Sequence, residues 1–408
     1  MSQAFSADLA IIGGGIVGMS CAYELARQSD LRIVLFDKNN PASGTTGGSA
    51  GVICLHDMGE IYALLTLKGH ARIRQLRDEH GFSFNTWGSL GVRYAPGVFP
   101  PPLDPYHQRF GYGGKESIYY HEFLDVNELT RRFPWIKPEG VVGARYYPNQ
   151  GFIDPYELVD LYERLAVATG RVQIMRNTPV LQMRKTGERI TSLVTRRGLW
   201  NVGTVLNAGG PWGAKIAALA GSNVAVTPQR IQVCVATGFD DGVTVAPLTS
   251  VPESVQEEGV WCRGEIGGTL LFGQHHHTTK GGFTVDPDYV NRINDDGYPK
   301  SVERVYRRYY YLPNSVFLNG WCCVYGTTED GFPILSRDEQ VENFYHALGM
   351  NGHGMTCHAG VAQAITELIL RNSTTLDVSD VMGQPAKMDF SVLNAGRFAK
   401  GKLLTFDL

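Results

Sequence analysis

The chain has 408 residues, of which 43% are hydrophobic and 19% are charged, and its formal net charge is −3 at pH 7. This length and composition allow a large buried core and predict two domains. The slightly negative charge argues against nucleic acid or an anionic membrane as the main partner. Because no stretch contains eighteen consecutive apolar residues, we expect no membrane-spanning helix.

The seven cysteines predict a reducing compartment. Their number is odd, and their spacing does not match a zinc finger. The first strand begins within ten residues of the N-terminus and runs into a glycine turn, which is not the pattern of a signal peptide. We therefore expect a cytoplasmic protein without a metal site.

The first element is a buried strand over residues 8–12 that ends in a glycine turn. The turn is Gly13-Gly14-Gly15-Ile16-Val17-Gly18, and a helix follows over residues 19–27. Such a turn points unpaired backbone N–H groups and the positive end of the helix dipole at one place, where a pyrophosphate fits. Gly13 allows the turn, Gly15 lets the backbone approach the phosphates, and Gly18 lets the helix pack close to the strand.

A second buried strand over residues 31–36 supports a dinucleotide site. It ends in Asp37, whose carboxylate can accept both ribose hydroxyls of an adenosine. A G-x-G-x-x-G pattern alone is weak, and a surface turn followed by a chance acidic residue is the alternative. The strand, the turn and the acidic residue together favour the dinucleotide interpretation.

A loop of small residues comes next, Pro41-Ala42-Ser43-Gly44-Thr45-Thr46-Gly47-Gly48-Ser49-Ala50-Gly51. A flexible linker has this composition. Because the loop follows directly after the ribose-binding position, we favour contact between its hydroxyls and amides and a phosphate.

The middle of the chain alternates between helical and strand patterns. An amphipathic helix over residues 62–80 has a basic face that we expect to be solvated, with Lys68, Arg72, Arg74 and Arg77. Short strands and proline-rich turns over residues 82–120 indicate that the chain leaves the nucleotide domain. A short helix over residues 124–133 follows. Another helix, over residues 155–169, begins with Asp154 as N-cap and Pro155 at the first helical position, and a strand over residues 172–175 comes after it.

The later part of the chain contains two further glycine turns, each after an apolar strand. The strand over residues 204–208 runs into Gly209-Gly210-Pro211-Trp212, and the strand over residues 344–348 runs into Gly349-Met350-Asn351-Gly352-His353-Gly354-Met355-Thr356 and a helix over residues 359–371. Between the two turns we expect strands over residues 230–235, 259–263, 269–273 and 316–322, and a charged helix over residues 286–310. A third glycine turn at a helix N-terminus can direct its dipole at a phosphate or a flavin carbonyl.

These motifs together resemble the D-amino-acid oxidase superfamily of flavoproteins, in the branch that holds glycine oxidase, D-amino-acid dehydrogenases and monomeric sarcosine oxidase. The resemblance covers nearly the whole chain and includes Gly151-Phe152-Ile153-Asp154-Pro155 and Thr328-Glu329-Asp330-Gly331-Phe332-Pro333. It implies bound FAD and an α/β fold (α+β overall), with a Rossmann-like FAD-binding domain and a mainly antiparallel sheet that forms a roof over the flavin.

The resemblance also implies a domain division and a set of binding residues. The FAD-binding domain is expected over residues 1–81, 143–225 and 320–385, the substrate domain over residues 82–142 and 226–319, and a C-terminal tail over residues 386–408. The expected cofactor-binding residues are Gly13, Gly15, Ile16, Val17, Gly18, Asp37, Lys38, Ser43, Gly44, Thr45, Thr46, Gly51, Val52, Val180, Ala208, Gly209, Trp212, Cys323, Gly352, His353, Gly354, Met355 and Thr356.

Two further matches are similar to sarcosine oxidase. The run from Cys323 to Asp330 fits that enzyme's C-x-Y-x-x-T-x-D pattern, in which the cysteine sulfur carries the flavin's 8-methyl carbon. Cys323 is therefore either covalently attached to FAD or a buried apolar thiol. Gly273-Gln274-His275, followed by Val285-Asp286-Pro287-Asp288, resembles the roof strand that places a histidine beside the substrate. His276 and His277 follow, but three consecutive histidines on a strand cannot all ligate one ion.

Three positions depart from these enzymes. Leu271 stands where sarcosine oxidases carry the lysine that promotes reaction with oxygen, and Tyr325 and Thr356 stand where related enzymes bind the substrate carboxylate with an arginine or a lysine. A carboxylate buried over a flavin needs a paired cation or several donors. The candidates to replace those cations are Arg263, Arg93 and Arg145. The alternative is a substrate without a free α-carboxylate.

The implied reaction is oxidation of a C–N bond of a small amine or amino acid, with hydride transfer to flavin N5 and hydrolysis of the resulting imine. His353 and His275 are expected to line the reacting face, where a neutral imidazole can accept the amine proton; a purely structural histidine is the alternative. Tyr325 and Arg263 complete the expected catalytic set. The expected electron acceptor is oxygen, a quinone or an electron-transfer protein, and an oligomer is compatible with the sequence. The competing interpretations are a 2-hydroxy-acid or polyol dehydrogenase on the same scaffold and the flavin subunit of a hetero-oligomeric dehydrogenase.

Overall fold

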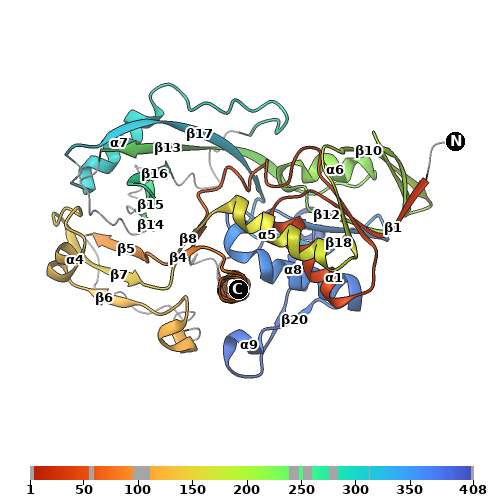
Figure 1. Cartoon of the computed structure of the whole chain (residues 1–408), viewed down its shortest axis with the longest axis horizontal. Helices are drawn as coiled ribbons and strands as arrows, with labels where there is room; N and C mark the ends of the chain where they lie inside the picture. Colours follow the sequence, from red (N-terminus) through yellow and green to blue (C-terminus); the bar gives the residue numbers. More distant parts are fainter. Residues whose placement is uncertain are drawn as a thin grey trace.

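Two eight-stranded sheets form the framework of the protein, a computed structural model of which is shown in Figure 1. The structure describes residues 4–54, 59–94, 111–238, 248–250, 260–274, 284–311 and 313–405. One sheet carries the first glycine turn and most of the long helices. The long strands β13 and β17 of the other sheet extend towards it in Figure 1.

The first sheet is built around parallel strands that are buried on both faces, as parallel sheets are. Strands β19, β12, β1, β2 and β9 run parallel in that spatial order, and β10, β11 and β18 add antiparallel edges. The strands are β1 (Ala4–Ile12), β2 (Ile33–Phe36), β9 (Val172–Met175), β10 (Val180–Thr186), β11 (Arg189–Thr195), β12 (Gly198–Asn207), β18 (Ile334–Arg337) and β19 (Phe344–Leu348).

Side chains of β1 and β2 alternate between two separate cores on either side of this sheet. Leu9 and Ile11 of β1 pack with the long helices, whereas Ala10 and Ile12 pack on the opposite side with Trp200. The helices on the first side are α1 (Ile16–Gln28), α2 (Gly59–His80), α5 (Pro155–Ala168) and α8 (Gly354–Arg371). On the other side, α6 (Gly213–Leu219) follows the turn η2 (Gly210–Trp212), and its side chains share one core with side chains of the sheet strands β10 and β11.

The second sheet is antiparallel except for the β14–β5 pair. Its strands in spatial order are β17 (Val316–Thr327), β13 (Thr227–Thr237), β16 (Thr269–Gln274), β15 (Val260–Glu265), β14 (Leu248–Ser250), β5 (Ser89–Tyr94), β7 (Val141–Tyr147) and β6 (Glu122–Leu124). Cys234, Cys262 and Phe272 on one face pack against α4 (Val126–Arg132) and α7 (Tyr298–Tyr309). The opposite face, with Arg263 and Trp321, contacts the small-residue loop of the first sheet.

Small elements complete the structure and hold the C-terminal segment in place. A three-stranded sheet joins β3 (Val52–Ile53), β8 (Gly151–Ile153) and β4 (Phe84–Asn85), and a two-stranded sheet joins β20 (Thr375–Asp377) and β21 (Lys387–Asp389). The remaining short elements are η1 (Gly111–Glu116), α9 (Ser379–Met382), η3 (Ser391–Leu393) and α10 (Gly396–Ala399). Phe390 and Leu393 lie in the same core as α1 and α8.

This architecture confirms the predicted fold class, a mixed α/β protein with a Rossmann-like sheet and a second, mainly antiparallel sheet. The predicted start of α5 is also correct, because Asp154 accepts hydrogen bonds from the amides of Tyr156 and Glu157 and Pro155 is the first helical residue. No helix among the described residues is both long enough and apolar enough to cross a bilayer.

Two sequence predictions are wrong. Lys68 and Arg72 of α2 are buried rather than solvated, because they pair with Asp380 and Glu24 at 2.7 and 3.1 Å. The expected helix over residues 286–310 is limited to α7, since Gly297 has a positive φ of 85° and Pro299 stands in the first helical turn. Residues 286–297 instead form an irregular segment beside β17, where the amide of Cys322 donates to the carbonyl of Arg292.

Candidate cofactor and active site

A cavity of about 480 Å³ lies at the carboxyl ends of four parallel strands. Gly13 follows β1, Asp37 follows β2, Ala208 follows β12 and Gly349 follows β19, and all four residues line the cavity. Ligands of open α/β sheets bind at this edge, where loops leave adjacent strands. The size is within the range of small-molecule sites.

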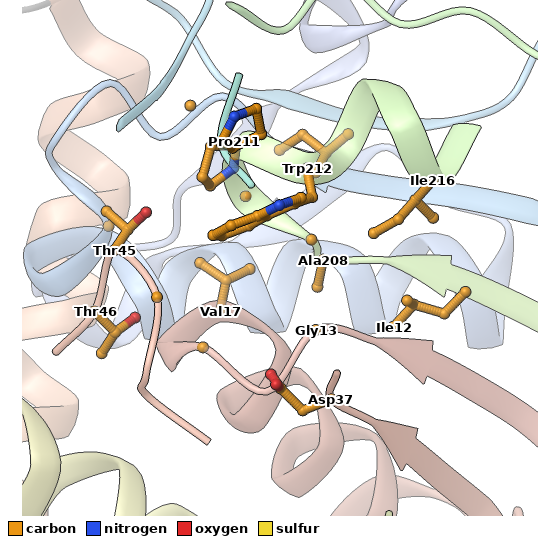
Figure 2. Close-up of a pocket in the computed structure, with 18 of the residues that line it drawn as sticks. Ile12, Gly13, Val17, Asp37, Thr45, Thr46, Ala208, Pro211, Trp212 and Ile216 are labelled. Carbon is orange, nitrogen blue, oxygen red and sulfur yellow. The ribbon is translucent and has the colours of Figure 1, made fainter. Parts of the chain in front are cut away.

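The cavity brings together the three glycine turns that the sequence shows far apart. The predicted residues that line it are Gly13, Gly15, Ile16, Val17, Asp37, Lys38, Ser43, Gly44, Thr45, Thr46, Val180, Ala208, Gly209, Trp212, Gly352, Gly354, Met355 and Tyr325. Figure 2 shows Asp37 beside Gly13, Thr45 and Thr46 on their loop, and Pro211 and Trp212 across the opening in that view.

The turn after β1 requires glycine for steric reasons. Gly13 has a φ of +115°, and a Cβ atom there would lie 2.4 Å from the carbonyl oxygen of Ala208. A Cβ atom on Gly18 would lie 1.9 Å from the carbonyl oxygen of Gly13, so α1 sits directly against the turn. Gly15 occupies the N-cap position of α1, but it has no side chain that could bond to the free amides of the first turn. The hydroxyl of Thr46 accepts from the amide of Ile16 at 3.1 Å in its place.

Asp37 is held in position by the turn that it faces. Its Oδ2 accepts from the amide of Gly14 at 2.7 Å, and its Oδ1 accepts from the amide of Asn39 at 2.7 Å. Burial raises the pKa of this carboxyl, while the two backbone hydrogen bonds oppose that change. The carboxylate is therefore fixed at the cavity wall. Each of its oxygens keeps one lone pair that can accept a hydrogen bond from a ribose hydroxyl.

The small-residue loop lies between the two sheets. The hydroxyl of Thr45 donates to the carbonyl of Val324, and the indole of Trp321 donates to the carbonyl of Gly48 at 3.0 Å. Cys323 packs against this loop, since a Cβ atom on Gly48 would lie 2.4 Å from the Cβ of Cys323. Cys323 is 3% exposed, and burial raises the pKa of its thiol to about 12.

The turn before α8 is fixed by Asn351, which the sequence did not single out as a binding residue. Its side chain accepts from the amide of Thr328 at 2.8 Å and donates to the carbonyl of Gly331 at 2.8 Å. The next residue, Gly352, has a φ of +89° and lies against the ring of Tyr325, which is 2.7 Å from the position of a Cβ atom. Two sheets therefore meet at this end of the cavity, β17 through Tyr325 and β19 through the turn.

Some of the predicted cofactor-binding residues, all of which the structure describes, do not line the cavity. They are Gly18, Gly51, Val52, Cys323, His353 and Thr356. His353 is the N-cap of α8 and its ring lies edge-on to Tyr62, with 5.4 Å between the ring centroids. The hydroxyl of Thr356 donates to the carbonyl of Val52 at 3.3 Å.

The candidate anchors for a substrate carboxylate differ in their surroundings. Arg263 is 3% exposed, pairs with Glu265 at 2.9 Å, donates to the carbonyl of Ala50 and stacks over Phe152. Arg145 is 6% exposed and donates to the hydroxyl of Tyr147 at 3.2 Å.

The remaining predictions concern exposed, apolar or undescribed positions. Arg93 is exposed on β5. Leu271 is buried on β16, cross-strand from Arg263. His275, His276 and His277 lie outside the described residues.

Several cavity residues were missed by sequence reasoning. They are Thr178, Pro179, Lys215, Ile216, Asp288, Arg292, Met350 and Asn351. Thr178 and Pro179 directly precede Val180, which was predicted, so a wider window would have included them. Asp288 lies in a run that resembles the family's roof strand but was not predicted to bind the cofactor, and Arg292 carries no local signal; both reach the cavity from the segment between the second sheet and α7.

The cavity fits an adenine dinucleotide on several independent grounds. Glycines such as Gly13 form its wall where a side chain would clash with the backbone. The first turn of α1, whose N-cap Gly15 has no side chain, faces it, and the fixed carboxylate of Asp37 lies at one end. A sequence model of one protein family, described as FAD dependent oxidoreductase, matches residues 8–368. The chain belongs to this family.

FAD is therefore the cofactor of this FAD-dependent oxidoreductase, and the resemblance to the D-amino-acid oxidase superfamily is confirmed. Among curated relatives, human mitochondrial sarcosine dehydrogenase is 22% identical over 91% of this chain. The chain spans 40% of the length of that relative. Monomeric sarcosine oxidase of Bacillus sp. (strain B-0618) is 25% identical over 91% of this chain and 94% of that protein.

Solved structures show the same fold across the family. L-proline dehydrogenase from P. horikoshii superimposes with a TM-score of 0.77, covering 98% of this chain and 100% of that chain at 21% identity. L-alpha-glycerophosphate oxidase from Mycoplasma pneumoniae superimposes with a TM-score of 0.68, covering 90% and 95% at 18% identity. The FAD-dependent oxidoreductase fold is therefore shared by proteins named for an amine substrate and by one named for an alcohol.

Proposed function

We propose that this chain oxidises a C–N bond of a small secondary amine or amino acid, giving an imine that water hydrolyses. The observation that carries the proposal is the meeting of β17 with the turn before α8 at one end of the cofactor cavity, where Tyr325 lies against Gly352. The sarcosine-named relatives match over nine-tenths of the chain and so support an amine rather than an alcohol as substrate.

Bound FAD supplies the acceptor for the hydride that leaves the carbon next to nitrogen. The chain's residues bind and orient the reactants. The amides of Gly354 and Met355 at the start of α8, an eighteen-residue helix, stabilise negative charge at the cavity wall. His353 stands between Gly352 and Gly354, which line the cavity, and is our candidate to accept the proton of the substrate amine.

The substrate carboxylate, if the substrate has one, needs a cation on the cavity-facing side of the second sheet. Arg145, which is 6% exposed on β7, is our first candidate. Arg263 is the second, because its ion pair with Glu265 already balances its charge. His275 and Tyr325 complete the proposed reacting face.

Cys323 remains a candidate for covalent attachment of FAD. It packs against the small-residue loop and stands two residues before Tyr325, which lines the cavity. Denaturation in acid tests this point directly: yellow colour that stays with the precipitated chain, and is released from a Cys323→Ser variant, is the expected result. Colour released from the unsubstituted chain would leave Cys323 as a buried thiol.

A second candidate function is oxidation of a 2-hydroxy acid or polyol, which the similarity to a glycerophosphate oxidase supports at the level of fold. A third is a flavin subunit that passes electrons to other chains, with oxygen, a quinone or an electron-transfer protein as the acceptor.

The domain division predicted from the sequence is part of the proposal. A reducing, cytoplasmic compartment is a further part of the proposal, supported by the seven cysteines, which are all buried and form no disulfide.

The test is anaerobic bleaching of the flavin absorbance by a panel of candidate substrates. Sarcosine, glycine, proline and iminodiacetate represent amines, and lactate and glycerol phosphate represent alcohols. We expect bleaching by at least one amine and by no alcohol, and slower bleaching by that amine in a His353→Asn variant. Bleaching by alcohols alone would replace the proposal with the second candidate, and a reduction rate that is unchanged in His353→Asn across pH would remove His353 from the reaction.

A further inference from the structure

Asp288 lines the cofactor cavity from a segment that is anchored beside the second sheet, where Thr284 pairs with Gln229 of β13. It lies on the irregular segment before α7, and its carboxylate accepts from three residues in the part of the molecule built on the first sheet. Its Oδ1 accepts from Lys38 Nζ at 2.5 Å and from Trp212 Nε1 at 2.7 Å, and its Oδ2 accepts from Lys215 Nζ at 2.6 Å. Lys38 follows β2, Trp212 ends η2 and Lys215 is on α6, so one carboxylate joins three elements.

One of the three donors, Trp212, lines the cavity, and a second donor, Lys38, lies against its ring. Lys38 Nζ lies 4.0 Å from the centroid of that ring, a cation–π contact. A Cβ atom on Gly44 would lie 3.3 Å from the same ring, so Trp212 lies directly over the small-residue loop. Lys38, Trp212, Lys215 and Asp288 all line the cavity.

The charges of this cluster, which we call the Asp288 clasp, are balanced within the protein. Lys215 also pairs with Asp286 at 2.5 Å, so two lysines face two aspartates. Partial burial alone would raise the pKa of the Asp288 carboxyl, but the bonds from Lys215, Lys38 and Trp212 hold it well below its usual range.

Breaking the ion pairs of the clasp requires little free energy. Side-chain exposure is 37% for Lys38, 36% for Asp288 and 47% for Lys215, so water and salt reach every ion pair. Exposed pairs of this kind are individually weak and are screened by salt. The contacts can therefore break transiently while the two sheets stay folded.

We propose that the Asp288 clasp closes the mouth of the FAD cavity and that FAD enters and leaves only when the clasp is open. The inference rests on FAD binding in this cavity. In this role Asp288 is a positioning residue: it holds Lys38 and Trp212 across the cofactor without touching the reacting atoms.

A purely electrostatic role for Asp288 predicts the opposite effect on FAD release. Replacing Asp288 by Asn removes a negative charge beside a ligand whose pyrophosphate is negative, which by itself slows release. Loss of a closing contact speeds release. Whether Asp288→Asn releases FAD faster or more slowly than the parent therefore separates the two roles. The rate of FAD association does not separate them, because both roles predict faster association.

Asp286→Asn is the matched control. It removes the same charge from the same segment and breaks a pair with Lys215, but in the described structure Asp286 binds Lys215 and the amide of Asp288 rather than Lys38 or Trp212. The amide oxygen of Asn can still accept from the amide of residue 288, as Asp286 Oδ1 does at 3.0 Å. We expect FAD release from this variant at the parent rate or more slowly.

The experiment measures FAD release from holoprotein in a Cys323→Ser background, where covalent attachment at that cysteine is impossible. Release is followed as the rise in flavin fluorescence after dilution. We expect release to be about fivefold faster in Asp288→Asn, the change that the loss of one good exposed ion pair produces. Equal or slower release from Asp288→Asn would overturn the clasp while leaving the cofactor site intact. An unsubstituted chain that takes up no FAD would overturn the cofactor site itself and the clasp with it.

Salt gives a second measurement that does not depend on how Asp288→Asn folds. Raising sodium chloride from about 0.05 to 0.5 M should speed FAD release from the parent, because exposed ion pairs are screened over this range. The same change should have a smaller effect on release from Asp288→Asn. Release from the parent that is insensitive to salt would contradict the proposal.

Discussion

Gly18 and Gly15, both in the turn after β1, differ in how much space a side chain would have, and this difference should appear in FAD binding. A Cβ atom on Gly18 would meet the backbone oxygen of Gly13 at 1.9 Å, which neither side of the contact can relieve by rotating a side chain. A Cβ atom on Gly15 would meet only the hydroxyl of Thr46 at 3.2 Å. The first contact requires α1 to move away from β1, and the second requires a shift of a few tenths of an ångström.

We therefore expect Gly18→Ala to abolish FAD binding or folding and Gly15→Ala to retain a folded chain with weakened FAD binding. The physical reason is that overpacking against backbone is relieved only by displacing an element. The measurement is FAD titration by fluorescence quenching, with circular dichroism to confirm that each variant is folded. Equal FAD affinity in Gly18→Ala and the unsubstituted chain would contradict the close packing of α1 on the turn.

Two buried histidines make stability depend on pH. His358 is fully buried, its Nε2 lies 2.8 Å from the hydroxyl of Tyr162 and its Nδ1 lies 2.8 Å from the carbonyl of Met355. Burial lowers the pKa of His358 to about 4, and burial likewise lowers the pKa of His70 to about 4. The unfolded chain binds these protons near pH 6.5, so the stability that the neutral forms contribute is complete above that pH and is lost as pH falls towards 4.

Between pH 7.5 and 5 we expect each histidine to remove about 2 kcal/mol from the free energy of unfolding. A His358→Gln variant should lose about half of the pH dependence in this window, because His70 is the other described histidine whose pKa is lowered by burial. Urea unfolding at several pH values checks this expectation. A variant whose stability falls with pH as steeply as that of the parent would show that His358 is protonated in the folded state near its ordinary pKa.

At the scale of elements, a buried ion pair fixes the C-terminal segment to the first sheet. Arg397 of α10 binds Asp330 through two hydrogen bonds of 2.7 and 3.0 Å and donates to the carbonyl of Phe332 at 2.8 Å. The side chains are 2% and 0% exposed. Asp330 precedes β18, and its turn is joined to the turn before α8 through Asn351, so the C-terminal segment supports one wall of the cavity from outside.

Replacing Arg397 by Met should lower the free energy of unfolding by about 3–5 kcal/mol, since a carboxylate is then buried without its partner. The double variant with Asp330→Asn should lose less than the two single variants added together. Arg371→Met is the control: its pair with Glu367 is exposed, and its loss should cost no more than about 1 kcal/mol. Equal losses from Arg397→Met and Arg371→Met in chemical denaturation would contradict the importance of the buried pair.

At the scale of the whole molecule, the small-residue loop is the place where both sheets and the cavity meet. Arg263 and Trp321 of the second sheet bind backbone carbonyls of this loop, and Thr46 of the loop caps α1 of the first sheet. A ligand that binds this loop is thereby linked to the stability of both sheets. The adenosine end of the cavity, with Asp37, adds contacts that only the full dinucleotide can make.

FAD should therefore raise the unfolding temperature more than flavin mononucleotide does. At a free concentration about 100 times its dissociation constant, FAD stabilises the folded chain by about 2.7 kcal/mol. Thermal unfolding of apoprotein with each flavin at the same concentration is the measurement, and Asp37→Ala should reduce the difference between them. Equal shifts from the two flavins would show that the adenosine end of the cavity contributes nothing to binding.

The sequence alone determined the parts of this protein whose causes are local. The apolar run of β1, the glycine turn, the cap at Asp154 and the strands β9 and β19 follow from residues within one or two turns of chain, because propensity, capping and glycine sterics act over that distance. The resemblance of several such motifs to one superfamily then indicated FAD.

Only the tertiary structure decided what depends on partners distant in sequence. Lys68 and Arg72 are buried because Asp380 and Glu24 reach them, and Arg263 is tied to Ala50 from another sheet. Asp288 reaches Lys38 across 250 positions of the chain. A charged residue is solvated, paired or placed at a cavity according to which oppositely charged groups the fold brings near it, and no local pattern in the sequence contains that information.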